Sequence, residues 1–191
     1  MNCVGRIQAQ EKESSSKMGA YYAELCRAMT LLGSRPRTIF LGQAVACAGT
    51  GMSKSFAGVS REKLLELPVF ESCQMGMSIG LALAGDLPVS VFPRQNFILS
   101  AMDQLVNHLD AIPRFSAYRP KVIIRTAVCS PSPLDPGPQH LGNFSDAFRL
   151  MLKTVRVVEL RTAEEIVSAY MAAVDREEST LLTEFPELYE C

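Results

Sequence analysis

The fold of this chain can be worked out from one stretch of its sequence, Leu67-Pro68-Val69-Phe70-Glu71-Ser72-Cys73-Gln74-Met75-Gly76-Met77-Ser78-Ile79-Gly80-Leu81-Ala82-Leu83-Ala84-Gly85. A short apolar strand at residues 67–70 is expected to lead directly into the carboxylate of Glu71, and a helix rich in small residues follows. Open α/β sheets place ligand-binding groups at such strand-to-helix junctions. Glu71 is therefore the first candidate functional residue. The alternative is an exposed glutamate that the dipole of a helix N-terminus favours.

The helix that follows Glu71 contains Gly76 and Gly80 in its interior. A glycine inside a helix costs roughly 1 kcal/mol relative to alanine, so these two positions need a reason. The close approach of another backbone or of a flat ligand would be one.

Composition limits the classes of protein that this chain can belong to. Its 191 residues suit one domain, and 48% of them are hydrophobic. The formal net charge of -1 implies no attraction to nucleic acid or to an anionic membrane. No apolar run approaches the ~18 residues that span a bilayer, and the N-terminus lacks a signal-peptide pattern. We expect a cytoplasmic protein with a flexible polar leader at residues 1–17 and one domain at residues 18–191.

Six cysteines are scattered along the sequence, at positions 3, 26, 47, 73, 129 and 191. No C-x-x-C pair and no cluster of cysteine with histidine is present, so the sequence predicts no metal site. Most of these cysteines lie in segments that are expected to be buried. Free buried thiols in a reducing cytoplasm are the expected state.

Apolar runs with strand character alternate with segments of helical periodicity. Strands are expected at residues 38–42, 67–70, 88–92, 121–125, 155–160 and 180–184, and helices at 21–32, 71–85, 96–109, 144–152 and 162–175. Asn96 is a candidate cap for the third helix. This alternation predicts an α/β fold: a doubly wound, mostly parallel sheet of about six strands with helices on both faces.

Common catalytic and phosphate-binding motifs are absent. The sequence has no Walker motif, no G-x-G-x-x-G and no G-x-S-x-G. Of its two histidines, His108 lies on an expected helix and is more typical of a structural residue. His140 lies in a loop rich in proline and glycine, where functional residues concentrate, although a surface histidine would have the same pattern.

Several segments taken in order resemble a known family. They are Leu-Gly-Gln-Ala-Val (41–45), Leu-Pro-Val-Phe-Glu (67–71) with its Gly/Ala helix, Leu-Ala-Gly-Asp-Leu-Pro-Val (83–89), Asn-Phe-x-x-x-Ala-Met-Asp-Gln-Leu-Val-Asn (96–107), Val-Ile-Ile-Arg-Thr (122–126) and Gly-Pro-Gln-His (137–140). Over residues 18–190 the chain resembles the pyrimidine-binding domain of thiamin diphosphate enzymes. The β chain of the 2-oxo acid dehydrogenase decarboxylase component is the nearest resemblance, and transketolase follows.

The resemblance implies a role for each matching residue. Glu71 would hydrogen-bond a ring nitrogen of the cofactor's aminopyrimidine and promote the tautomer that deprotonates the thiazolium carbon. This role needs a desolvated, rigidly held carboxylate. Phe97 would stack on the pyrimidine, Val69 would contact the cofactor, and His140 with Gln139 would face the substrate.

Three positions depart from the family's pattern. Gln43 replaces a glutamate that is thought to couple active sites, and Leu141 follows His140 where the family has serine. Arg94 stands where the family has apolar or aromatic residues. It could meet a phosphate or a substrate carboxylate, or it could reach solvent. Gln43, Arg94 and Gln139 are therefore candidate substrate residues.

The sequence also lacks the Gly-Asp-Gly…Asn motif with which the family holds Mg²⁺ and the diphosphate, and it ends near the point where the pyrimidine-binding domain ends. The resemblance therefore implies that this chain binds half of the thiamin diphosphate. A partner subunit with that motif would bind the Mg²⁺ and the other half. The complex would be a heterotetramer, or would contain a homodimer of this chain, and the chain alone would be inactive.

Decarboxylation of a 2-oxo acid with acyl transfer, or ketol transfer, is the implied reaction. The alternative is a non-catalytic descendant of the domain that serves assembly or regulation, which Gln43 and the missing further domain favour. A third possibility is a nucleotide-binding protein with an unrelated doubly wound fold, against which the missing phosphate loops count.

Overall fold

The computed structural model describes residues 19–131 and 135–190, and it contains one six-stranded sheet in which every pairing is parallel. The strands are β1 (Thr38–Gly42), β2 (Leu64–Glu66), β3 (Leu87–Phe92), β4 (Ile123–Ala127), β5 (Arg156–Glu159) and β6 (Thr180–Glu184). They lie in the order β2-β1-β3-β4-β6-β5. The predicted doubly wound sheet is therefore confirmed. The predicted leader lies outside the described residues.

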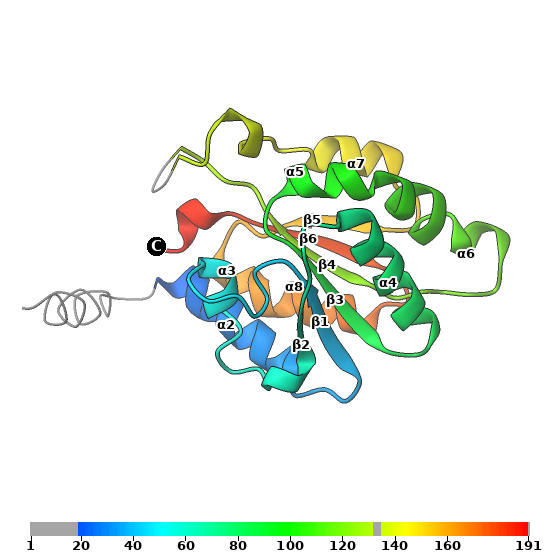
Figure 1. The fold of residues 1–191 in the computed structure, drawn as a ribbon, viewed down its shortest axis with the longest axis horizontal. Coiled ribbons are helices and arrows are strands. Elements are labelled where there is room, and N and C mark those ends of the chain that lie inside the picture. The colour runs from blue at the N-terminus through cyan, green and yellow to red at the C-terminus, as the bar shows by residue number, and fades with distance from the viewer. Residues whose placement is uncertain (1–18, 132–134, 191) are drawn as a thin grey trace, which may run out of the picture.

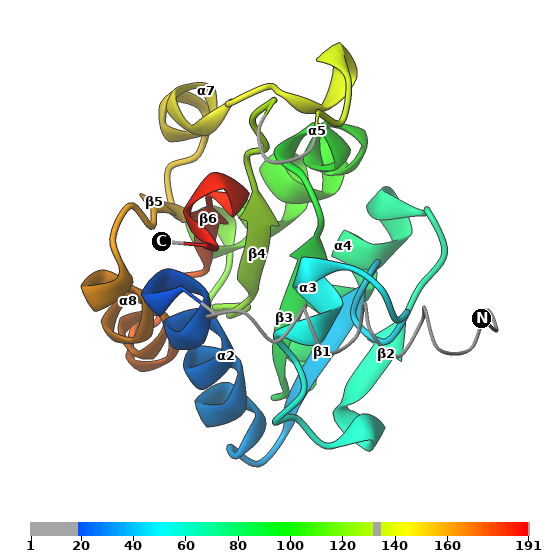
Figure 2. The ribbon, with the colours of Figure 1, turned by 90° about the vertical axis from the view of Figure 1, so that its left-hand side faces the viewer.

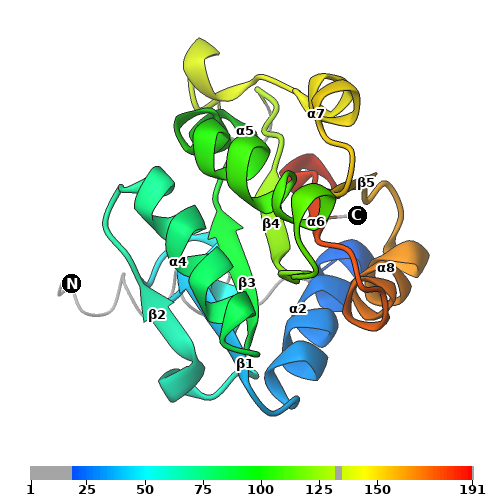
Figure 3. The same cartoon turned by 90° about the vertical axis from the view of Figure 1, so that its right-hand side faces the viewer.

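Helices cover both faces of the sheet (Figures 1 and 3). On one face lie α2 (Ala20–Gly33) and α8 (Ala163–Asp175), which pack against each other. The other face carries α4 (Glu71–Leu83), α7 (Ser145–Met151), α6 (Ile112–Phe115) and a segment whose winding changes through α5 (Gln95–Ile98), η2 (Leu99–Ala101) and η3 (Asp103–Leu109). Short turns lie in the connections: α3 (Gly51–Lys54), η1 (Arg61–Lys63), η4 (Pro138–His140) and η5 (Pro186–Leu188).

The two helical layers produce two hydrophobic cores, one on each side of the sheet. Ile123 and Ile124 are neighbours in β4, and both are fully buried, but each belongs to a different core. Successive side chains of a strand point to opposite faces, so a strand covered on both faces favours apolar residues on both. This is why the apolar run of β4 is recognisable in the sequence.

The strand expected at residues 67–70 is wrong. β2 ends at Glu66, and the amide of Leu67 donates one further hydrogen bond to the carbonyl of Gly42 at 2.8 Å. Pro68 has no N–H to donate, so the pairing with β1 stops there. A connection of four residues then leads to Glu71, and within it Val69 is 73% exposed and Phe70 is 61% exposed.

The expected cap at Asn96 is also wrong, because the helix begins one residue earlier, at Gln95. The buried amide of Gln95 donates to Ser145 Oγ and to Thr183 Oγ1, both at 2.9 Å, and its Oε1 accepts from the amide of Phe144. Tertiary hydrogen bonds rather than a local cap fix this helix start.

The expectation of buried cysteines is not met by the described residues. Cys47 and Cys73 are exposed, Cys26 and Cys129 are half-buried, and all four are free thiols. Cys47 lies on the loop after β1 and Cys73 on the outer side of α4, which the apolar character of their neighbours did not reveal.

Gly42 ends β1 at a point where α4 reaches across to β3. Its φ is +137°, and a Cβ atom there would lie 2.2 Å from the carbonyl oxygen of Val91 and 2.7 Å from Nε2 of Gln74. That Nε2 donates to Val91 O at 2.9 Å and to Ser90 Oγ at 3.1 Å. Only glycine permits this docking of the first turn of α4, and the docking fixes where Glu71 lies.

Within residues 19–131 and 135–190, no helix combines the length and the apolar character needed to cross a bilayer.

Replacement of Gly42 by alanine should destabilise the chain, whereas the same change at Gly80 should not. A strained backbone costs about 1–3 kcal/mol, and the clash with Val91 O adds to this in Gly42→Ala. A Cβ atom on Gly80 would meet no other atom within 4 Å, so Gly80→Ala should raise the free energy of unfolding by up to about 1 kcal/mol. Urea unfolding of both variants tests this, and equal effects would contradict the assigned role of Gly42.

Candidate functional site

Glu71 is the first residue of α4 and is only 8% exposed. Its Oε1 accepts a hydrogen bond from Nε2 of Gln43 at 2.9 Å. Gln43 directly follows β1, so the end of one strand and the start of one helix meet at this carboxylate. Among the residues that the structure describes, Gln43 is the sole hydrogen-bond partner of the Glu71 side chain, which leaves Oε2 for a ligand.

The loop that carries Gln43 is held by a second carboxylate, at the end of β2. Glu66 accepts hydrogen bonds from four consecutive backbone amides, those of Ala44, Val45, Ala46 and Cys47, at 2.5–3.0 Å. Partial burial of Glu66 alone would raise its pKa, but these N–H groups outweigh burial and hold the pKa below its usual range. Sequence reasoning missed Glu66, although the small residues after Gln43 are what let the backbone wrap around it.

Phe97 and His140 form the second contact pair of the site. Their ring centroids lie 5.5 Å apart with the planes at 69°, an edge-to-face contact between α5 and the turn η4. Nδ1 of His140 is buried and has no hydrogen-bond partner among the described residues. The two residues that the resemblance places beside cofactor and substrate are therefore neighbours in space.

The remaining predicted residues are arranged differently. Gln139 is exposed, and Val69 lies with its side chain largely in solvent, so neither is packed into the site. Arg94 lies between β3 and α5, and its Nε contacts Sγ of Cys129 at 3.4 Å. The roles of all these residues in binding remain predictions.

The Gln43–Glu71 pair and the Phe97–His140 pair both lie at the edge of the sheet where the carboxyl ends of the strands meet. α4 begins after β2 and α5 begins after β3, so both helices start at the carboxyl ends of parallel strands. Met75 of α4 and Ile98 of α5 share one hydrophobic core, which packs the two helices together. Ligands of doubly wound sheets bind at this edge.

A cleft of about 430 Å³ opens at the same edge, between the loops that follow β1, β3, β4 and β6. Arg94 and Cys129 line it, whereas Glu71, Phe97 and His140 do not. Figure 2 looks at this end of the molecule, with α3 and the C-terminal turn toward the viewer.

An ion pair that is wholly buried connects the strands next to this cleft. Nε and Nη2 of Arg125 in β4 donate to the two carboxylate oxygens of Glu184 in β6, at 3.0 and 3.1 Å. Arg125 Nη1 also donates to Ser55 Oγ at 2.7 Å, and Tyr189 donates its hydroxyl to Glu184. Burial alone would lower the pKa of Arg125, but the charge of Glu184 outweighs it and raises that pKa. The arginine is therefore charged.

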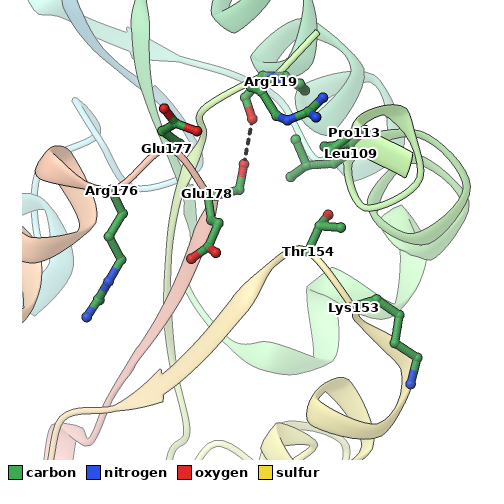
Figure 4. Close-up of a pocket in the computed structure, with 10 residues that line it drawn as sticks. Leu109, Pro113, Arg119, Lys153, Thr154, Arg176, Glu177 and Glu178 are labelled. Carbon is green, nitrogen blue, oxygen red and sulfur yellow. Dashed lines mark hydrogen bonds between the residues drawn. The ribbon is translucent and has the colours of Figure 1, made fainter. Parts of the chain in front are cut away.

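A larger cavity of about 620 Å³ lies at the opposite edge, before β4, β5 and β6 (Figure 4). Its cations do not converge on one point. Arg119 donates to the carbonyls of Ser116 and Tyr118, Lys153 donates to that of Leu150, and Figure 4 shows Lys153 and Arg176 directed away from each other. The described part of the chain contains no group of three or more His, Cys, Asp or Glu side chains that could hold a metal ion.

Glu66→Gln should destabilise the chain in a pH-dependent way. The folded-state pKa of Glu66 lies below its unfolded value of about 4.3, so its contribution is fully present above that pH and is lost as the pH falls through the folded-state pKa. The difference in stability between wild type and variant should therefore be largest near neutrality and shrink below about pH 4. Melting curves across this range measure it, with the exposed Glu62→Gln as the control. A difference that is independent of pH would contradict the role of the charge.

Comparison with known proteins gives a likeness in fold. No family model matches the sequence, and no curated protein matches it. A solved structure described as a split-gene transketolase, an inactive β4 tetramer, superposes with a TM-score of 0.69 at 17% identity, over 88% of this chain and 51% of that one. Transketolase from Campylobacter jejuni superposes with a TM-score of 0.69 at 12% identity, over 88% of this chain and 26% of that one. The chain thus spans about half of the first protein and a quarter of the second, and it has a transketolase-like fold.

Proposed function

We propose that this chain is the pyrimidine-binding subunit of a split thiamin diphosphate-dependent enzyme, in which Glu71 is the catalytic carboxylate. The observation that carries the proposal is the buried position of Glu71 at the start of α4, with one oxygen held by Gln43 and the other without a partner among the described residues. A largely buried carboxylate with one oxygen still open is suited to hold or accept a proton at a ligand nitrogen.

Phe97 and His140, at the same edge of the sheet as Glu71, would suit an aminopyrimidine. Phe97 offers an aromatic ring for an offset or edge contact, which contributes about 0.5–1.5 kcal/mol beyond the burial of area. The buried Nδ1 of His140, beside that ring, lacks a partner that a substrate or the cofactor could provide. When bound, thiamin diphosphate supplies the carbanion chemistry, and the protein supplies position and electrostatics. In this proposal Glu71 fixes the ring, Phe97 packs on it, and His140 faces the reacting substrate.

The proposal assigns Mg²⁺ and the diphosphate to a partner subunit, because this sequence has no Gly-Asp-Gly…Asn motif. One structural neighbour is described as a split-gene transketolase, so division of that enzyme between chains has a precedent in this fold. The reaction would be decarboxylation of a 2-oxo acid with acyl transfer, or ketol transfer.

An exposed apolar strip on and before α4 supports assembly with another chain. Val69, Phe70, Met77 and Leu83 are 73%, 61%, 38% and 48% exposed. Gly80 lies in the same strip and has free space around it, so its lack of a side chain is not required by the packing of this chain. Large contiguous apolar patches are rare on monomers and mark interaction surfaces. The complex would bury this strip against the partner subunit or a second copy.

Assembly and cofactor binding should therefore depend on each other. In calorimetry with thiamin diphosphate and Mg²⁺, the isolated chain should give no appreciable binding, and addition of the partner should restore it. Phe70→Ser should weaken assembly in light scattering, because it removes apolar area from the strip. The control is Tyr118→Ser, because Tyr118 is an aromatic residue of similar exposure, 68%, that lies outside the strip. Tight binding by the isolated chain would contradict the assignment of the diphosphate to a partner.

In the assembled complex, Glu71→Gln should reduce turnover by about 10²–10⁴-fold, the usual contribution of general acid–base groups. The amide has a similar shape but no negative charge, so hydrogen–deuterium exchange at the reactive carbon of the cofactor should slow in parallel. His140→Ala should slow turnover while this exchange persists.

Retention of most activity by Glu71→Gln would reject the catalytic assignment. A non-catalytic role in assembly or regulation, which the replacement of the family's glutamate by Gln43 favours, would then be the better account.

A further inference from the structure

Arg94 is the one cation among the residues that line the cleft of about 430 Å³ at the carboxyl edge of the sheet. The rest of the lining is mostly small or apolar, and it includes Ala44, Met52, Pro93, Ala127, Pro136 and Pro186. A cleft of this size is in the range that holds a small organic molecule. A single charge in an apolar cleft fixes the orientation of a ligand.

The guanidinium of Arg94 is positioned but not neutralised. Its Nε is directed to Cys129 Sγ at 3.4 Å, and the structure gives Arg94 no ion pair and no other hydrogen bond with a described residue. Both Nη groups are therefore available, in the planar arrangement that matches a carboxylate or a phosphate. Arg125 lies nearby in β4 but is already paired with Glu184, so it cannot serve this purpose.

Two further polar side chains of the cleft are engaged within the protein. Thr50 forms the capping box of α3 with Ser53, which lies outside the cleft, and the hydroxyl of Tyr189 donates to Glu184. A sugar phosphate would need many hydrogen-bond partners, which this lining does not offer. Glu190 is an exposed carboxylate at the same cleft and disfavours a doubly charged anion.

We propose that this cleft binds a small monocarboxylate with an apolar body. The carboxylate would form a two-pronged hydrogen bond with Arg94, and the hydrocarbon part would lie against Met52, Ala127 and the prolines. Because Arg94 is a candidate substrate residue, this inference deepens the proposed function by naming the class of ligand, and it rests on that function in this respect. None of the residues is assigned to thiamin diphosphate, so binding itself needs no cofactor and can be tested without it.

The test is titration of the isolated 191-residue chain with 3-phenylpropionate, followed by ¹H–¹⁵N NMR. Saturable shifts should appear at Met52, Ala127 and Cys129. The neutral amide of the same acid should bind at least ~10-fold more weakly, since a charge-assisted bidentate hydrogen bond is lost. Ribose 5-phosphate and inorganic phosphate should also bind more weakly than the carboxylate.

Variants of Arg94 test whether its side chain binds the carboxylate. Arg94→Gln should weaken 3-phenylpropionate binding by ~10-fold or more, and Arg94→Lys, which keeps the charge but loses the planar fork, should bind with intermediate strength. Arg156→Gln, which changes an exposed arginine in β5, is the matched control and should leave binding unchanged. The same NMR spectra report whether each variant is folded. No saturable binding by the wild type, equal binding of acid and amide, tighter binding of a phosphate, or unchanged affinity in folded Arg94→Gln would each overturn the proposal.

Discussion

The carboxyl edge of this protein depends on the buried ion pair between Arg125 and Glu184. Both side chains are fully shielded from water, and removal of two charges from water costs several kcal/mol each unless geometry and further hydrogen bonds compensate. Here two hydrogen bonds join the guanidinium to the carboxylate. Arg125 donates a further hydrogen bond to Ser55, and Glu184 accepts one from Tyr189. The aromatic ring of Phe56 also lies 5.1 Å from the guanidinium. Loss of either charge would leave the other buried and unpaired, so the pair must be kept or lost as a unit.

This requirement has a consequence for the candidate site. The pair joins the ends of β4 and β6 to the segment after α3 and to the C-terminal turn, and these four segments meet around the cleft that contains Arg94. The loop after β1 is fixed independently by Glu66, whose four amide donors leave it little freedom. Gly42 completes the arrangement by letting Gln74 dock on β3. The candidate binding groups at this edge are thus held in place by the fold, which would lower the entropic cost of binding a ligand.

The sequence predicted most of the sheet well because its central strands are buried and contain short apolar runs, such as Ile123-Ile124 in β4 and Leu181-Leu182 in β6. It also predicted that Glu71 begins a helix. It failed at residues 67–70, where the apolar character suggested a strand although Pro68 lacks the N–H that pairing needs. It also failed where distant residues decide the structure, because Gln95 fixes its helix through Ser145 and Thr183 rather than through a cap at Asn96. The proximity of Phe97 to His140 and of Gln43 to Glu71 could not be read from spacing alone, because each contact joins segments more than 25 residues apart. The family resemblance named these residues, and the fold brought each pair into contact.

Three carboxylates lie close to this edge, and they differ in how completely the protein satisfies them. Glu184 is neutralised by a bidentate arginine, and Glu66 is satisfied by four backbone amides. Glu71 is also buried, yet the described residues give it one neutral donor, from Gln43. Its Oε2 has no protein donor among the described residues and is open to solvent or to a ligand. The dipole of α4 lowers the cost of a charge at this position, but it adds no donor for Oε2. A ligand nitrogen would supply that donor, so the open oxygen of Glu71 is the physical argument for the role that we propose.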